Sequence, residues 1–450
     1  MFIRVCRSML FYRVILCVGT LLLLFFTEGD VQRIAPFAAA AILAISAGLV
    51  LLKNTRRLTL PFLLLSLLLI FCYDSFHIFI GYVWLLPIAL VAIAVHIIRL
   101  RPKFRVGASF WGLVAVAVAT VLGGIGIIPA GDYFRPIALA YTLALGPGLV
   151  LVYLLLKNEF RTVEDERSFM ADLSALAITA AVVVYGYYLS KIPDFVRDGS
   201  FGLTPQWANN ISTLLMLSFP ALFVRARRKY YCLLLGLLAA VAAICSGSNG
   251  GLLFASVELV VCLVWLLQTD PRPIPRLWTR SALIYCAVVA VAGVYYFVSR
   301  PTTEGMMTSV TGRGSLFLRG FENFAQNPLF GTGFGYLGNA DLYNGKMGAI
   351  NWFHVFIAQV VGGLGICGIL AWGYQLFLRA RLALRVWWGE GIAPALCYLG
   401  LFLMSQVNPG EFCPVPYAFL AVAYFVFIEN RTESRGRATS VRHKIKERKE

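Results

Sequence analysis

Apolar residues occur along the chain in long runs that short polar or charged segments separate. Crossing a bilayer takes roughly 20 mostly apolar residues per helix, and several runs reach that length. Backbone polar groups in lipid must be paired within the protein, so these runs predict helices. No alternating, turn-punctuated pattern suggests a β-barrel. The fourteen candidate spans are residues 11–27, 35–52, 58–73, 76–98, 107–129, 134–156, 170–190, 211–224, 230–246, 250–267, 281–299, 352–378, 391–408 and 414–428.

Three of these runs, at 58–73, 211–224 and 414–428, are short for a span. The sequence therefore predicts an all-α polytopic membrane protein with about 12–14 transmembrane helices. Composition agrees, because 59% of the residues are hydrophobic and 14% are charged, which excludes an ordinary soluble domain. We expect a single transmembrane domain over residues 1–429.

The basic residues give the predicted topology. When the connections alternate from a cytoplasmic N-terminus, 31 of the 39 Lys and Arg residues fall on the inner side and 8 on the outer side. Every inner connection is basic, as the positive-inside rule requires. We therefore expect both termini in the cytoplasm and a large extracytoplasmic loop at 300–351.

The net charge of +17 is spread over these inner connections and a basic cytoplasmic tail at 430–450. The tail has almost no apolar content, and we expect a disordered arm on anionic headgroups rather than a nucleic-acid site. The ten cysteines form no CxxC pair and no cluster with histidine at metal-ligand spacing. The sequence thus indicates neither a disulfide framework nor a metal site.

The outer loop contains a pattern typical of a short amphipathic helix at 315–327. Phe317, Phe321 and Phe324 follow one another at helical spacing and share one face. Asn327 precedes Pro328, and a residue before proline avoids helical geometry, so the helix should end there. Beside a membrane, such an aromatic face should lie flat in the interface.

Arg313 and Arg319 stand at the start and on the polar flank of this helix. A guanidinium suits a phosphorylated substrate because its charge is permanent and its fork is bidentate. The alternative is that both side chains only reach lipid phosphates. The glycines at 331–335 follow no predicted strand, so we expect a compact turn there and no nucleotide-binding loop.

His354 closes the loop that carries the two arginines. Imidazole is the side chain best suited to accept a proton near neutral pH, so His354 is the candidate base. The alternative is a structural hydrogen bond at the membrane surface. Glu258 lies deep inside a predicted span, and an intramembrane carboxylate can indicate a proton or ion path. A transporter of a lipid-linked or small solute is therefore the competing class.

The chain resembles the O-antigen ligase and O-antigen polymerase superfamily of bacterial membrane glycosyltransferases over about 200–380. In that family an arginine precedes a tryptophan by four residues, and a Pro-Leu-hydrophobic-Gly-x-Gly turn follows. Arg313, Phe317 and the turn at 328–333 match this pattern. The family then has a histidine that opens a helix with a Gly-hydrophobic-hydrophobic-Gly element, as His354 and residues 365–368 do here.

The resemblance implies a fold like that of C-type glycosyltransferases, with short helices in the outer loop. It implies an undecaprenyl diphosphate-linked oligosaccharide as donor, with no nucleotide sugar, no cofactor and no metal. The acceptor would be a glycan or lipid at the outer face of the bacterial inner membrane, either lipid A core for a ligase or another repeat unit for a polymerase. Arg313 would hold the donor diphosphate, Arg319 would assist, and His354 would activate the acceptor.

The chain departs from the family pattern at three positions. Asn249 stands where the family usually has a diphosphate-binding arginine, Phe317 replaces the tryptophan, and Val355 replaces an asparagine beside the histidine. Arg197, Arg300 or Arg319 would then supply the missing positive charge to the donor. The remaining alternative is a non-catalytic relative.

Overall fold

The computed structural model describes residues 9–52, 55–71, 81–82, 84–100, 105–133, 136–159, 162–193, 196, 205–299, 304–342, 353–408 and 410–447. Regular structure in these ranges is helical, apart from one isolated β-bridge between Tyr133 and Tyr336. This confirms the predicted all-α class.

Six helical segments within the described ranges are long and apolar enough to cross a membrane. They are Met9–Thr27, Val31–Leu51, Ala138–Asn158, Glu164–Ser190, Asn249–Thr269 and Phe356–Val386. Shorter apolar helices accompany them at Leu85–Leu100, Ala108–Leu122, Tyr231–Ile244 and Glu390–Met404. The protein is therefore a multi-pass membrane protein, while the number of 12–14 spans stays a prediction.

The helices group into two compact units, which are described separately. The first consists of Met1–Phe104 and Asn158–Leu259, and the second of Arg105–Lys157 and Val260–Glu450. The prediction of one transmembrane domain over 1–429 stays a prediction.

In the first unit, α9 packs against α2, α4 and α13. A capping box starts α9, with the Thr162 side chain accepting from the Asp165 amide. Arg13 of α2 pairs with the buried Asp172 of α9 at 2.6 Å. The helices of this unit are α2 Met9–Thr27, α3 Val31–Leu51, α4 Thr59–Ile70, α5 Leu85–Leu100, α9 Val163–Ser190, α11 Pro205–Met216, α12 Pro220–Ala226, α13 Tyr231–Ile244 and the beginning of α14 Asn249–Thr269.

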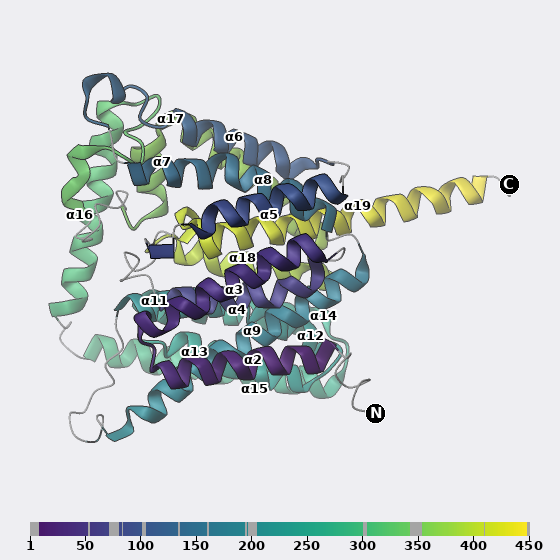
Figure 1. Cartoon of the computed structure of the whole chain (residues 1–450). Coiled ribbons are helices and arrows are strands. Elements are labelled where there is room, and N and C mark those ends of the chain that lie inside the picture. The colour runs from purple at the N-terminus through teal and green to yellow at the C-terminus, as the bar shows by residue number, and fades with distance from the viewer. Residues whose placement is uncertain are drawn as a thin grey trace. The chain divides into compact units, whose positions relative to one another are not determined.

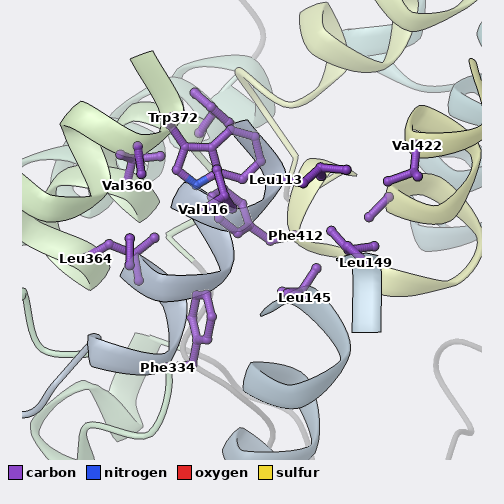
Figure 2. Close-up of a cluster of buried hydrophobic side chains, with 14 of the residues drawn as sticks. Leu113, Val116, Leu145, Leu149, Phe334, Val360, Leu364, Trp372, Phe412 and Val422 are labelled. Atoms are coloured by element: carbon purple, nitrogen blue, oxygen red, sulfur yellow. The ribbon is translucent and has the colours of Figure 1, made fainter. Parts of the chain in front are cut away.

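In the second unit, α6 and α17 lie side by side (Figure 1). Figure 2 shows the apolar core between them, where Val116 of α6 and Trp372 of α17 meet side chains from the other helices and from Phe412. The helices of this unit are the end of α14, α6 Ala108–Leu122, α7 Pro136–Leu143, the π-helix Ala144–Gly148, α8 Leu149–Glu159, α15 Pro273–Ser299, α16 Glu304–Gln326, α17 Phe356–Val386, α18 Ala393–Met404 and α19 Phe419–Glu447.

Helix α17 is broken at Gly365, which has φ 62° and ψ −153°. In an unbroken helix the sixteen residues from Phe356 to Trp372 would span about 24 Å. The two rings are instead in contact, with centroids 5.2 Å apart. The first turns of α17 therefore fold back toward the later part of the same helix. Only glycine adopts this backbone conformation routinely.

The turn at 328–333 docks on this break and pairs the backbone groups that the break releases. The four bonds run from Thr332 N to Gly362 O (2.9 Å), Gly333 N to Gly363 O (2.8 Å), Ile366 N to Pro328 O (2.9 Å) and Cys367 N to Leu329 O (3.1 Å). Gly331 and Gly333 have positive φ values, 65° and 70°. The expectation of a compact turn is confirmed. The turn provides hydrogen-bond partners for backbone groups of α17 that the break leaves without a partner in their own helix.

Helix α16 ends at Gln326, as the Asn327-Pro328 pair predicts. It begins at Glu304, eleven residues before the predicted start. The helix therefore includes the glycines at 312 and 314, although glycine has a low helix propensity. Phe317 and Phe321 are exposed and pack edge to face at 5.0 Å, so an aromatic surface is present as expected.

The expectation of a disordered C-terminal arm is wrong for residues 430–447. Helix α19 continues through them to Glu447 and extends beyond its neighbours α6 and α8 in the same unit (Figure 1). The physical reason is an anchor at its midpoint, where the buried Lys157 of α8 binds Glu429 at 2.9 Å and Glu433 at 2.7 Å.

Gly365→Ala is expected to lower the thermal unfolding temperature in detergent. The added Cβ would lie 2.5 Å from the Pro328 carbonyl oxygen, in a conformation that alanine avoids, at a cost of about 2–4 kcal/mol. Gly373→Ala is the matched control, because a Cβ there has no neighbour within 4 Å and the site is helical. That change should be neutral or stabilise by up to about 1 kcal/mol. Equal losses in both variants would contradict the docking described here.

Candidate active site at the N-terminus of helix α17

His354 lies two residues before α17 in a left-handed backbone conformation, with φ 50°. Such values are uncommon outside glycine and indicate a conformation that the surroundings impose. The constraint is visible on both sides of the residue. The backbone amide of the buried Phe353 donates to the side-chain oxygen Oε1 of Gln359 at 3.1 Å. The backbone amide of Gln359 in turn donates to the Val355 carbonyl oxygen at 2.9 Å.

The segment at 405–412, of which the structure describes 405–408 and 410–412, lies between α18 and α19 and contacts the start of α17. Helix α18 has twelve residues and a length of about 18 Å, shorter than the roughly 30 Å apolar core of a bilayer. Helix α18 ends at Met404, and the Phe356 backbone amide donates to the Ser405 carbonyl oxygen at 2.9 Å. Next in the segment, the Asn408 side chain hydrogen-bonds the His354 imidazole.

Helix α16 brings Arg313 to the same region. Gly320 of α16 packs so closely on α17 that a Cβ would lie 2.9 Å from the Ala358 Cβ. Arg313 precedes Gly320 by seven residues, which places both on one helical face. Arg313 is half-buried, and its positive charge acts on the His354 imidazole. The guanidinium therefore lies close enough to the imidazole to act on it, although the two residues are 41 positions apart in the chain.

The environment lowers the pKa of His354 below the usual 6.5. Burial is the largest cause, the charge of Arg313 is the second, and the hydrogen bond to Asn408 acts in the opposite direction. Burial likewise lowers the pKa of Arg313, which remains a cation at physiological pH. The imidazole is thus neutral at pH 7 and able to accept a proton.

Arg319 points to a different face of α16 from Arg313, because six helical residues rotate by about 240°. Its Nη1 lies 3.4 Å from Glu322 Oε2 in an exposed pair. The structure therefore does not group Arg319 with the Arg313–His354 pair. Arg197 and Arg300 lie outside the described residues.

Asn249 belongs to the first unit, where it begins α14 and is exposed. The preceding Ser248 donates to Asn209 Oδ1 at 2.5 Å and accepts the Gly251 amide at 3.0 Å. This hydrogen-bonded turn places Asn249 at the N-terminus of α14. A role for Asn249 in binding the donor stays a prediction.

Sequence reasoning missed Asn408 and the segment that carries it. A signal was present, since residues 405–411 read Ser-Gln-Val-Asn-Pro-Gly-Glu and interrupt the last two apolar runs. The predicted span at 391–408 absorbed this polar stretch, although the helix ends at Met404. In the described part of the chain, no group of three or more His, Cys, Asp or Glu side chains has the geometry to hold a metal ion.

Residues 234–373 match the model of a protein family described as O-antigen ligase. The match includes Arg313, the turn at 328–333 and His354, and it confirms the resemblance found in the sequence. No curated protein matches the chain.

Arg313→Met is expected to raise the pKa of His354 toward 6.5, because it removes a positive charge that disfavours the imidazolium. Histidine-selective NMR of the protein in detergent measures this shift, and the chain has only four histidines to assign. Arg319→Met, which removes an equal charge from another face of α16, should leave the titration unchanged. An equal shift in both variants, or none in either, would contradict the proximity of Arg313 and His354.

Proposed function

We propose that this member of the O-antigen ligase family transfers an oligosaccharide from undecaprenyl diphosphate to an acceptor at the outer face of the bacterial inner membrane. Glycan transfer of the ligase or polymerase type is the chemistry of the family. The observation that supports the proposal for this chain is that the charge of a half-buried guanidinium, Arg313, acts on a buried imidazole whose pKa is lowered, His354. These are the two groups that such a transfer needs.

The leaving group needs a cation. When the bond between the sugar C1 and the diphosphate oxygen breaks, negative charge develops on the diphosphate. In this proposal Arg313 stabilises that charge with a bidentate fork in partly desolvated surroundings, where the interaction is stronger than in water. Arg313 is thus the proposed donor-binding residue, and this role requires no metal ion.

The acceptor needs a base. Its hydroxyl oxygen forms the new bond to C1, and its proton passes to the free ring nitrogen of His354. The products are the glycosylated acceptor, undecaprenyl diphosphate and an imidazolium that returns its proton to water. The lowered pKa keeps the base unprotonated between turnovers at neutral pH.

Donor binding should also strengthen the base. In the free protein the charge of Arg313 lowers the pKa of His354. A bound diphosphate offsets that charge, so the pKa of the imidazole rises while the donor occupies the site. Proton abstraction is then favoured when there is a donor to react with the acceptor.

The membrane context fits a lipid-linked donor. Phe317 and Phe321 are 37% and 45% exposed on the helix that carries Arg313, so this helix presents an apolar surface to the interface. A polyprenyl carrier entering from the bilayer would meet Arg313 at its headgroup. The proposed topology keeps both termini in the cytoplasm and this loop outside, as the distribution of basic residues predicts.

Two parts of the proposal rest on the family resemblance alone. The acceptor is lipid A core for a ligase or another lipid-linked repeat unit for a polymerase. The position of Asn249 leaves a second donor cation to be supplied, for which Arg197, Arg300 and Arg319 are the proposed candidates.

A transfer assay with purified protein in liposomes tests the proposal. The donor is undecaprenyl diphosphate-linked oligosaccharide, and lipid A core and a second lipid-linked repeat unit are offered as acceptors in parallel. His354→Ala should reduce transfer by about 10²–10⁴-fold, because the base is lost. Glu258→Gln, which neutralises a buried carboxylate of α14, should retain transfer.

Full transfer by His354→Ala would refute the proposal. Loss of surface polysaccharide in cells with Glu258→Gln, together with normal transfer by His354→Ala, would instead indicate a transporter.

A further inference from the structure

The segment at 405–412 contacts the rest of the unit at three places. At its start, the Ser405 carbonyl oxygen accepts the Phe356 backbone amide. At its middle, the Asn408 side chain hydrogen-bonds the His354 imidazole. At its end, Glu411 enters a network of buried polar groups on α17 and α18 that the proposed transfer does not use. Its described residues form turns at 405–408 and a short 3-10 helix at Gly410–Phe412 instead of a continuous helix, so its position depends on these contacts.

Arg379 of α17 is the centre of the buried network. Its Nη1 donates to Glu411 Oε1 at 2.9 Å and to the Tyr398 hydroxyl at 2.6 Å. The side chains of Arg379 and Glu411 are 3% and 1% exposed. Three aromatic rings surround the guanidinium, with centroids 4.6 Å (Tyr398), 5.2 Å (Phe425) and 5.8 Å (Trp372) from its carbon.

Burying both charges of an ion pair costs desolvation free energy, so the pair need not stabilise the fold. Removing one partner, however, leaves the other charge buried without compensation. The pair therefore allows few positions for Glu411. The backbone transmits this restriction, because the Glu411 amide donates to Ser405 Oγ at 3.0 Å and the Ser405 carbonyl accepts the Phe356 amide. Phe356 follows His354 by two residues. Phe412 completes the connection by packing on Phe356 and Trp372.

We propose that the segment at 405–412 is a positioning element for the base, in which the Asn408 carbonyl oxygen accepts the N–H of one His354 ring nitrogen and the Arg379–Glu411 pair fixes the segment. The other ring nitrogen is then left with its lone pair for the acceptor hydroxyl. Asn408, Glu411 and Arg379 act through His354 and do not touch the substrate. The inference rests on the proposed function for its catalytic meaning, while the contact itself is independent of it.

In this proposal the Asn408 oxygen accepts, because a donating amide would occupy the lone pair that the base needs. An accepting oxygen favours the protonated imidazole, in agreement with the direction in which Asn408 moves the pKa of His354. Arg313 is the charged group that acts on His354 in the described part of the chain, and its effect has the opposite sign. Asn408 and Arg313 thus move the pKa of His354 in opposite directions.

The test combines an NMR titration without substrates with a pH profile of transfer. Asn408→Asp places a carboxylate beside the ring and should raise the pKa of His354 by about one unit, which moves the acid limb of the kcat/KM profile to higher pH. Asn408→Leu removes the acceptor, so the pKa should fall and the acid limb should move to lower pH. We expect kcat of this variant to fall at least about tenfold with an unchanged KM for the donor, because the tautomer is no longer fixed.

Glu411→Gln tests the buried pair, and Glu429→Gln is its matched control. The control breaks a comparably buried pair with Lys157 in the same unit, whose contacts are with α6 and α8 and not with the segment at 405–412. Glu411→Gln should change the His354 titration in the direction seen for Asn408→Leu and lower kcat. Glu429→Gln should leave the titration unchanged.

Each outcome tests either the positioning role or the proposed function. If neither Asn408 variant moves the His354 titration, the positioning role is refuted whatever the enzyme does. If both move it while His354→Ala transfers normally, the contact stands and the proposed function fails. If Glu411→Gln leaves the titration unchanged, or Glu429→Gln changes it equally, the role of the buried pair is refuted. Should Asn408→Leu fail to fold, the isosteric Asn408→Asp decides alone.

Discussion

A helix that breaks in an apolar surrounding must find partners for the peptide groups that it releases. In α17 these groups lie on either side of Gly365, and the turn at 328–333 satisfies them with four backbone hydrogen bonds. The turn follows directly on α16, so this pairing also fixes where α16 ends. It thereby orients the helix that carries Arg313 and the folded-back start of α17 that follows His354. The junction is thus one of the contacts that determine where Arg313 and His354 lie.

The two proposed site residues could be singled out because polarity is a strong signal in an apolar chain. Arg313 and His354 stand at the two ends of a polar stretch in the predicted outer loop, and Pro328 marks the end of the helix that carries Arg313. The junction itself left no comparable signal. Its hydrogen bonds join backbone groups 30 or 38 residues apart in the chain, and the glycines at 331, 333 and 365 predict only permissive backbone. That Gly365 breaks α17 depends on what packs against it.

The three features that the sequence did not predict share one cause. Asn408 lies in a polar stretch that a window long enough to find spans averages away, so its meeting with His354 was not visible. Arg379 directly follows the predicted span at 352–378 and so falls among the 31 inner basic residues, although Glu411 and three aromatic rings enclose it. The tail was expected to be disordered from its composition, but Lys157 anchors α19 and the helix continues. In each case a tertiary contact decided the outcome.

The most direct test of the account is an experimental structure of the protein in a lipid nanodisc with undecaprenyl diphosphate bound. The account predicts the diphosphate against the Arg313 guanidinium, the His354 ring on the side open to an acceptor, and the 328–333 turn seated on the α17 break. A diphosphate bound in another cavity, or Arg313 and His354 pointing into different cavities, would contradict it.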